Sequence, residues 1–369
     1  MHLAASFFII PYLHTTLSSS ASTRRMFDQN FRYDKNVDSY KYLPKRSELP
    51  SVEGWPEGAA WFWGPDDGLG RLNFQTPKRI KRALKESKTG EFTSLNAPLL
   101  TFTNPPFFHR PIASHKITNF SGDPLAALND DELSFNTQTT SHIDGFRHFG
   151  EQTTRMFYNG CRESDFRGPD ANTKCGLEVW AERGIVGRGI LLDVARYREF
   201  KGKGGDALSA GAIMVDELAE VARCQGLDLR RKGEGGDIDI GDILLVRTGF
   251  LKAYQALSPS ERIDLATNPP AFLGLEPSEE MADFLHDSYF SAVVSDNPAV
   301  EAAPLPEEFE GSLHEYLIPL WGVPIGEMWD LERLSVLCEK RKGWKFLVTS
   351  APFNVKGGVA SWANAIAIL

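Results

Sequence analysis

Runs of apolar residues along the chain predict several buried strands. The longest run extends from Gly184 to Val194 and is flanked by glycine, as is typical of a strand covered on both faces. Shorter runs predict further strands at 97–102, 243–246, 290–294 and 346–352. The apolar residues from Val359 onward also indicate burial.

Other segments carry helical signals. Thr76-Pro77 is a typical helix start, so we expect a helix to about Lys88. Apolar spacing or capping residues predict further helices at 210–223, 277–286 and 331–340. Strands and helices alternate without a repeat or a linker, which predicts a single mixed α/β domain over residues 49–369.

Residues 1–48 are predicted to be an N-terminal tail. The stretch 27–50 is polar and has few aliphatic residues. Residues 4–13 are mildly apolar but too short to span a membrane. Arg24 and Arg25 give a weak resemblance to a targeting segment. A disordered tail, or translation that starts at Met26, are the alternatives for the same residues.

Composition narrows the class of protein. The 369 residues are 42% hydrophobic and 24% charged, which is typical of a globular domain. The net charge is −9 and no basic cluster stands out, so we expect neither a nucleic-acid nor a membrane partner and a cytoplasmic location. The four scattered cysteines lack metal-site spacing and are predicted to be single thiols.

The strongest chemical signal is Asn136-Thr-Gln-Thr-Thr-Ser-His-Ile-Asp-Gly-Phe-Arg-His148. If residues 133–144 form a strand, Gln138, His142 and Asp144 share one face, because side chains alternate along a strand. Gly145 then permits a turn that brings His148 over that face. Nitrogen and oxygen donors of this kind suit Zn or Mn.

One strand rarely completes a metal site, so distal donors are expected. His314 and Glu327 are the candidates, because Glu327 stands among glycine, proline and apolar residues where an unpartnered carboxylate is costly. Trp61, Trp63 and Phe146 are candidates for binding an aryl substrate, with core packing as the alternative.

The chain resembles the cyclase family of metal-dependent hydrolases, which includes bacterial-type kynurenine formamidase and isatin hydrolase. That family carries His-x-Gly-Thr-His-x-Asp-x-x-x-His, and this chain has Gln138-Thr-Thr-Ser-His142-Ile-Asp144-Gly-Phe-Arg-His148. Further matching stretches span residues 50–369 in consistent order, namely Gly189-Ile-Leu-Leu-Asp-Val194, Gly241-Asp-Ile-Leu-Leu-Val-Arg-Thr-Gly249, Ser295-Asp-Asn-Pro298, His314, Glu327 and Thr349-Ser-Ala-Pro352.

The resemblance implies a swivelling β/β/α fold and one or two divalent ions, Mn or Zn. His142 and Asp144 would hold one ion, and Asp144 would bridge to a second held by His314 and Glu327. His148 would be the general acid/base. Gln138 departs from the family's first histidine, and its weaker carboxamide donor favours a harder ion such as Mn, or a single occupied site.

The implied function is that of a kynurenine formamidase-like (arylformamidase-like) hydrolase. It would use metal-bound hydroxide to cleave an amide, formamide or cyclic amide of an aryl compound, as in tryptophan catabolism. The resemblance also implies a homo-oligomer, a dimer or tetramer. Two alternatives stay open: a catalytically silent small-molecule-binding protein on the same scaffold, and a cyclase or dehydratase of specialised metabolism.

Overall fold

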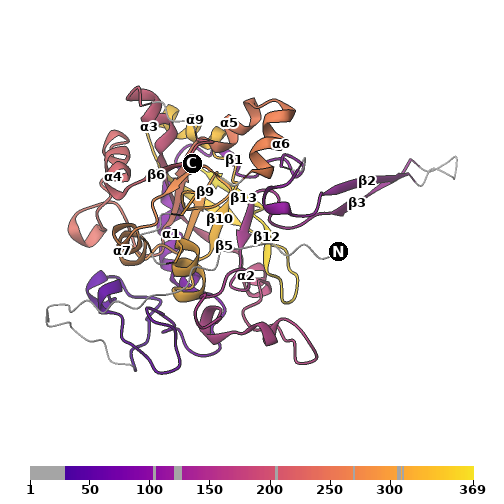
Figure 1. The fold of residues 1–369 in the computed structure, drawn as a ribbon. Helices are drawn as coiled ribbons and strands as arrows, with labels where there is room; N and C mark the ends of the chain where they lie inside the picture. The colour runs from indigo at the N-terminus through magenta and orange to yellow at the C-terminus, as the bar shows by residue number, and fades with distance from the viewer. Residues whose placement is uncertain are drawn as a thin grey trace.

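A curled mixed β-sheet with helices packed around it forms the body of the protein (Figure 1). The structure, a computed structural model, describes residues 30–102, 105–119, 127–203, 207–268, 271–305, 309 and 311–369. Among these residues, nine strands make one sheet in the order β1-β13-β11-β5-β7-β9-β10-β4-β12. This is the mixed α/β architecture that the sequence predicted.

The strands of the large sheet are short, apart from β5. Their bounds are β1 Phe92–Ser94, β4 His142–Asp144, β5 Ile185–Asp193, β7 Ile243–Arg247, β9 Ala292–Ser295, β10 Ile325–Glu327, β11 Lys345–Ser350, β12 Ala360–Trp362 and β13 Ala365–Ile368. Two strand pairs lie apart from this sheet, β2 Ser114–Asn119 with β3 Asn129–Ser134, and β6 Gly211–Ile213 with β8 Leu273–Leu275.

The α-helices are α1 Pro77–Ala83, α2 Glu178–Arg183, α3 Val194–Phe200, α4 Val215–Cys224, α5 Phe250–Ala256, α6 Pro259–Thr267, α7 Glu279–Asp287, α8 Leu313–Glu315 and α9 Glu332–Arg341. In Figure 1, α3, α4 and α7 lie on one side of the molecule, and the β2–β3 hairpin projects from the other. None of the helices in the described ranges is long and apolar enough to cross a membrane.

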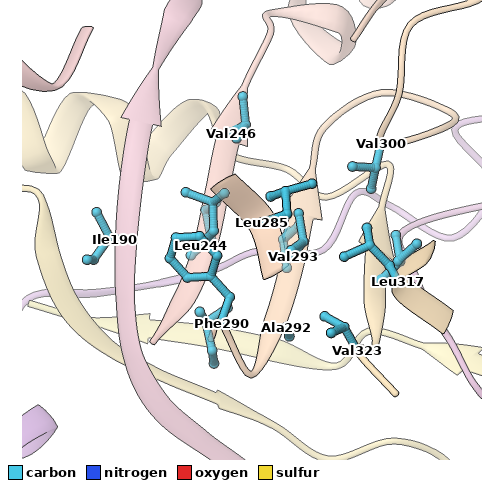
Figure 2. Close-up of a cluster of buried hydrophobic side chains, with 14 of the residues drawn as sticks. Ile190, Leu244, Val246, Leu285, Phe290, Ala292, Val293, Val300, Leu317 and Val323 are labelled. Atoms are coloured by element: carbon cyan, nitrogen blue, oxygen red, sulfur yellow. The ribbon is translucent and has the colours of Figure 1, made fainter. Parts of the chain in front are cut away.

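The core lies against the parallel strands β5, β7, β9 and β10. Figure 2 shows Ile190 of β5, Leu244 of β7 and Val293 of β9 side by side, with Leu285 of α7 and Phe290 packed against them. All five of these residues are buried. Parallel strands covered on both faces require such apolar runs, and the strands predicted at 184–194, 243–246 and 290–294 are confirmed as β5, β7 and β9.

Two strand predictions are wrong, one in its existence and one in its bounds. Residues 97–102 form no strand, because Pro98 begins a turn in which the Thr101 N–H donates to the Pro98 carbonyl at 2.9 Å. The predicted strand 133–144 is two strands, β3 and β4, separated by a turn. Asn136 makes that turn, since its side-chain oxygen accepts from the Gln138 N–H at 2.9 Å and its carbonyl accepts from the Thr139 N–H at 3.1 Å.

The predicted helix at 210–223 begins later than expected. Residues 211–213 form β6, which pairs with β8, and helix α4 follows from Val215 to Cys224. The helices predicted at 77–88, 277–286 and 331–340 are confirmed as α1 with a following 3₁₀ turn, α7 and α9.

Part of the segment predicted as a tail packs on the domain. Tyr33, Val37 and Leu43 are buried in the main core, and the Tyr33 N–H donates to the Phe62 carbonyl at 3.1 Å. These three apolar side chains are spread among polar neighbours, which conceals their burial in the sequence. Residues 1–29, with the expected targeting or disordered segment, lie outside the described residues.

The cysteines also differ from the expectation of four single thiols. Cys161 and Cys175 form a disulfide, with Cα atoms 6.8 Å apart, while Cys224 and Cys338 are free. The loop between the bonded cysteines folds back on itself, a juxtaposition that spacing alone does not reveal.

Candidate metal centre

The short strand β4 carries two of the residues of the candidate site, His142 and Asp144. Its neighbours are β10, which places Glu327 opposite His142, and β12, which places Trp362 opposite His142 on the other side. His142 and Asp144 are two residues apart on one strand and therefore face the same way, as does the paired Glu327. The side chains of His142 and Asp144 are fully buried.

His142, Asp144 and Glu327 form a tight group of donors. The His142 Nε2 atom lies 3.3 Å from Glu327 Oε2 and 3.7 Å from Asp144 Oδ1. The other ring nitrogen, Nδ1, donates to the Thr140 carbonyl at 2.7 Å. This bond fixes the orientation of the imidazole and directs Nε2 at the carboxylates.

His148 and Gln138 lie at one side of this group. The His148 N–H donates to the Gly145 carbonyl at 2.9 Å, which makes the turn that returns the ring toward β4. His148 Nε2 is then 3.8 Å from Asp144 Oδ2. The Gln138 side-chain nitrogen is 2.7 Å from Asp144 Oδ1 and 2.6 Å from His148 Nδ1.

His314 contacts the group through Glu327, and its ring centroid is 6.3 Å from that of His148. It lies in α8 and places Nε2 3.1 Å from Glu327 Oε1. Its Nδ1 is 2.8 Å from both carboxylate oxygens of Glu301. The structure thus brings together the predicted donors Gln138, His142, Asp144, His148, His314 and Glu327 from three separate segments of the chain, 138–148, α8 and β10. We call His142, Asp144, His148, His314 and Glu327 the donor cluster.

The charges in the cluster act strongly on one another. Burial disfavours the charged form of His314, but Glu301 and Glu327 outweigh it and raise the pKa of His314 well above its usual range. Burial likewise opposes ionisation of Glu327, yet His314 and His142 hold the pKa of that carboxyl far below its usual range. For His148 burial dominates and lowers the pKa of the imidazole.

The donor set fits a divalent cation. The buried atoms His142 Nε2 and Asp144 Oδ2 have no hydrogen-bond partner among the residues that the structure describes. Leaving such groups unpaired costs about 1–3 kcal/mol each, which a cation between them would offset. Two overlapping groups have ligand atoms within 4.8 Å of one another: His142, Asp144 and Glu327, and Asp144, His148 and His314.

The aromatic residues predicted to bind substrate make core contacts. The Trp61 indole N–H donates to the Pro319 carbonyl at 2.7 Å, and Phe146 packs on Tyr158 with ring centroids 4.2 Å apart. Trp63 packs on Phe74 at 4.9 Å. These contacts are typical of core packing, and a role of the three rings in binding substrate stays a prediction.

Several residues around the centre were not predicted from the sequence. Glu301, buried against His314, follows shortly after the matching stretch Ser295-Asp-Asn-Pro298, which was its only signal. The Arg110 guanidinium donates to the Gln138 carbonyl at 2.8 Å. The Trp329 indole N–H donates to the His142 carbonyl at 2.8 Å and so anchors β4.

The hydroxyls beside His142 differ in their availability. The Ser141 hydroxyl donates to the Met328 carbonyl and accepts from the Ala97 N–H, which occupies it structurally. The Thr140 hydroxyl is buried and has no hydrogen-bond partner in the described part of the chain.

Comparison with known proteins identifies relatives of this fold. A family model described as "Putative cyclase" matches residues 75–302. A crystal structure of "a novel cyclase" is 28% identical, with a TM-score of 0.71 over 84% of this chain and 97% of the other. No protein among the curated sequences matches.

Two isatin hydrolase structures share the fold at lower identity. One, bound to the product analogue thioisatinate, is 12% identical with a TM-score of 0.51, covering 80% of this chain and 99% of the other. Isatin hydrolase A from Ralstonia solanacearum is 13% identical with a TM-score of 0.51, covering 79% and 97%.

Proposed function

The chain belongs to the cyclase family, and on that premise we propose that it is a metal-dependent hydrolase of an amide, formamide or cyclic amide of an aryl compound. The observation that carries the proposal is the buried group of His142, Asp144 and Glu327. Two of its ligand atoms, His142 Nε2 and Asp144 Oδ2, have no hydrogen-bond partner among the described residues. When bound there, a divalent cation such as Mn or Zn supplies Lewis acidity, which polarises a carbonyl and makes a water more acidic.

His148 is the residue proposed to move the proton. Its side chain is 21% exposed, whereas that of His142 is fully buried and that of His314 is 11% exposed. A group that exchanges a proton with substrate must be reachable by it, and His148 is the most accessible histidine of the donor cluster. It would accept the proton of the attacking water and deliver it to the leaving nitrogen.

The substrate class rests on a likeness of fold and on the chemistry of the centre. Isatin is a cyclic aryl amide, and isatin hydrolases share this fold. The centre combines a buried cation site with an accessible acid/base, which suits attack of water on an amide carbonyl and protonation of a poor leaving nitrogen.

The test is metal content together with turnover. The protein is stripped with a chelator, reloaded with Mn or Zn, and assayed on an aryl formamide and on isatin. We expect activity only in the loaded protein, and a loss of roughly 10³-fold in His142→Ala, because a metal centre supplies several kcal/mol of transition-state stabilisation.

Glu280→Ala is the control, because Glu280 is exposed on α7. It should leave metal content and rate unchanged. Tight binding of the aryl compounds without turnover in the loaded protein would instead support a silent binding protein. Ring closure or loss of water in the products would support a cyclase or dehydratase.

A further inference from the structure

We propose that Arg110 binds an acidic group of the substrate, so that the enzyme prefers an aryl amide that carries a carboxylate. The inference rests on the proposed function and adds to it a narrower substrate class and the residue that recognises it. Arg110 lies outside the three segments that carry the donor cluster.

The guanidinium of Arg110 lies beside the donor cluster without pairing with its carboxylates. Its Nη1 donates to the Gln138 carbonyl at 2.8 Å, and the side-chain nitrogen of Gln138 is 2.7 Å from Asp144 Oδ1. Burial lowers the pKa of Arg110, and the negative charges of Asp144 and Glu327 oppose that shift. Even so, no ion pair joins Arg110 to a carboxylate among the residues that the structure describes.

The backbone just before Arg110 is held in an unusual conformation. Phe108 and His109 have φ angles of 59° and 54°, in the left-handed region, although neither is glycine. This conformation is costly for a bulky residue and persists only where the surroundings enforce it. Phe107 provides an anchor, since it is buried and packs on Phe250 with ring centroids 5.9 Å apart. Strained residues are common at binding sites, and this strained pair leads directly into Arg110.

The guanidinium is fixed in place and still open to a ligand. Its Cζ atom lies 4.9 Å from the centroid of the Phe108 ring, and this stacking acts together with the hydrogen bond to Gln138. The Arg110 side chain is half-buried, and its other N–H groups donate to no residue in the described part of the chain. A planar guanidinium with free N–H groups matches the two oxygens of a carboxylate.

The charge of Arg110 becomes available when the centre is loaded. Without an ion, Asp144 and Glu327 attract the guanidinium. A divalent cation held by His142, Asp144 and Glu327 would balance those two negative charges. The positive charge of Arg110 would then act on an anionic substrate, whereas a neutral aryl amide would gain nothing from it.

The test compares two formamides of the same shape and different charge. ortho-Formamidobenzoate carries a carboxylate, which ortho-formamidobenzamide replaces by a neutral amide, and release of formate is measured with metal-loaded protein. We expect wild type to prefer the benzoate. Arg110→Gln should lower kcat/KM for the benzoate by roughly 10–100-fold, mainly through KM, because hydrogen bonds to a charged group are lost. The rate with the benzamide should stay unchanged.

Calorimetry gives a second readout that does not depend on turnover. ortho-Aminobenzoate and ortho-aminobenzamide are titrated into the same loaded proteins. Arg110→Gln should weaken binding of the benzoate by a similar factor and leave binding of the benzamide unchanged. Arg110→Lys keeps the charge but not the planar fork, and should keep part of the preference. Arg223→Gln, which removes an exposed arginine of α4, is the control and should match wild type.

Equal losses for both compounds in Arg110→Gln, with or without a loss of metal, would overturn the inference, because the arginine would then only balance the charges of Asp144 and Glu327. Wild type that treats benzoate and benzamide alike would overturn it as well. Should Arg110→Gln fail to fold, Arg110→Lys decides, and a benzoate preference equal to that of wild type would count against the inference. Loaded wild type that hydrolyses neither formamide would overturn the proposed function, while the calorimetric comparison would still decide the inference.

Discussion

Glu301 contacts the donor cluster through a single histidine. Both of its carboxylate oxygens are 2.8 Å from His314 Nδ1, and Glu301 is only 5% exposed. A carboxylate in this position fixes the tautomer and the orientation of a ligand imidazole. Residues of this kind do not touch the ion, yet they decide how well the ligand binds it.

We predict that Glu301→Gln lowers the affinity for the cation by roughly 10–100-fold, as loss of such a partner commonly does. Competition against a fluorescent chelator measures the dissociation constant. Glu280→Gln, an exposed position on α7, is the control and should bind as the wild type does. An unchanged affinity in the folded Glu301 variant would contradict the assignment.

His286, a buried histidine outside the donor cluster, makes the stability of the fold depend on pH. His286 is fully buried, with Nδ1 2.8 Å from Asp287 Oδ1, and Arg71 donates to its carbonyl at 2.8 Å. Burial, followed by the charges of Arg71 and Arg46, outweighs Asp287 and lowers its pKa from an ordinary 6.5 to about 4. Between these values the unfolded chain binds the proton and the folded chain does not, so stability falls as the pH falls.

We therefore predict that, as the pH falls from 6.5 to 4, the free energy of unfolding falls by about 3 kcal/mol more in the wild type than in His286→Gln. Denaturant unfolding at several pH values measures it, as the difference between variant and wild type. The comparison is needed because buried Asp296, whose pKa is raised to about 6, changes stability in the opposite direction and is present in both proteins. Parallel curves for the two proteins would refute the prediction.

At the scale of elements, the β2–β3 hairpin projects away from the body of the molecule in Figure 1. Its register puts Ile117 and Leu133 on the same face, and they are 63% and 51% exposed. The opposite face carries the Lys116–Glu132 ion pair. The face of Ile117 and Leu133 also carries the His115–Asp131 ion pair. An isolated two-stranded hairpin is marginally stable in water, so the exposed Ile117 and Leu133 side chains are suited to contact with a second copy of the chain.

We predict a dimer or tetramer that depends on this face. Replacing Ile117 and Leu133 together by lysine should convert it to a monomer, because the charges would have to be buried at the interface. Light scattering coupled to size-exclusion chromatography measures the mass. Thr118→Lys, on the opposite face, should leave the mass unchanged, and a monomeric wild type would rule out this contact.

The elements that could be predicted are those whose character is local. β5 and β7 contain the apolar runs 190–192 and 243–246, which are typical of strands covered on both faces, and α7 carries its own cap at Ser278. β4 has only three residues, two of them ionisable, so no apolar pattern marks it. Its position comes from pairing with β10 and β12, and such long-range contacts are not visible in a local pattern.

At the scale of the whole molecule, metal removal tests whether the bound ion stabilises the fold. A ligand that binds only the folded state stabilises it by about 2.7 kcal/mol at a hundred times its dissociation constant. We predict that a chelator lowers the melting temperature of loaded wild type, because the ion links β4 to β10. His142→Ala, which lacks a ligand, should melt at the same temperature with and without chelator.

The candidate centre could be assembled from the sequence only in part. Gln138, His142, Asp144 and His148 are neighbours in the chain, and their spacing carried the prediction. His314 and Glu327 lie far along the chain and were reached through their odd surroundings and the family resemblance. Glu301 was missed because its role depends on where the His314 ring nitrogen points, which is a property of the folded chain alone.

The position of β4 between β10 and β12 also has a consequence for synthesis. Both partner strands follow β4 by roughly 180 residues or more. At about 5–20 residues per second, β4 leaves the ribosome some 10–40 s before β10 exists. During that interval its edges are unpaired, and we expect polar His142 and Asp144 to disfavour pairing of this strand with other nascent chains. The residues that would bind the ion would thus also limit association of the strand before its partner strands are made.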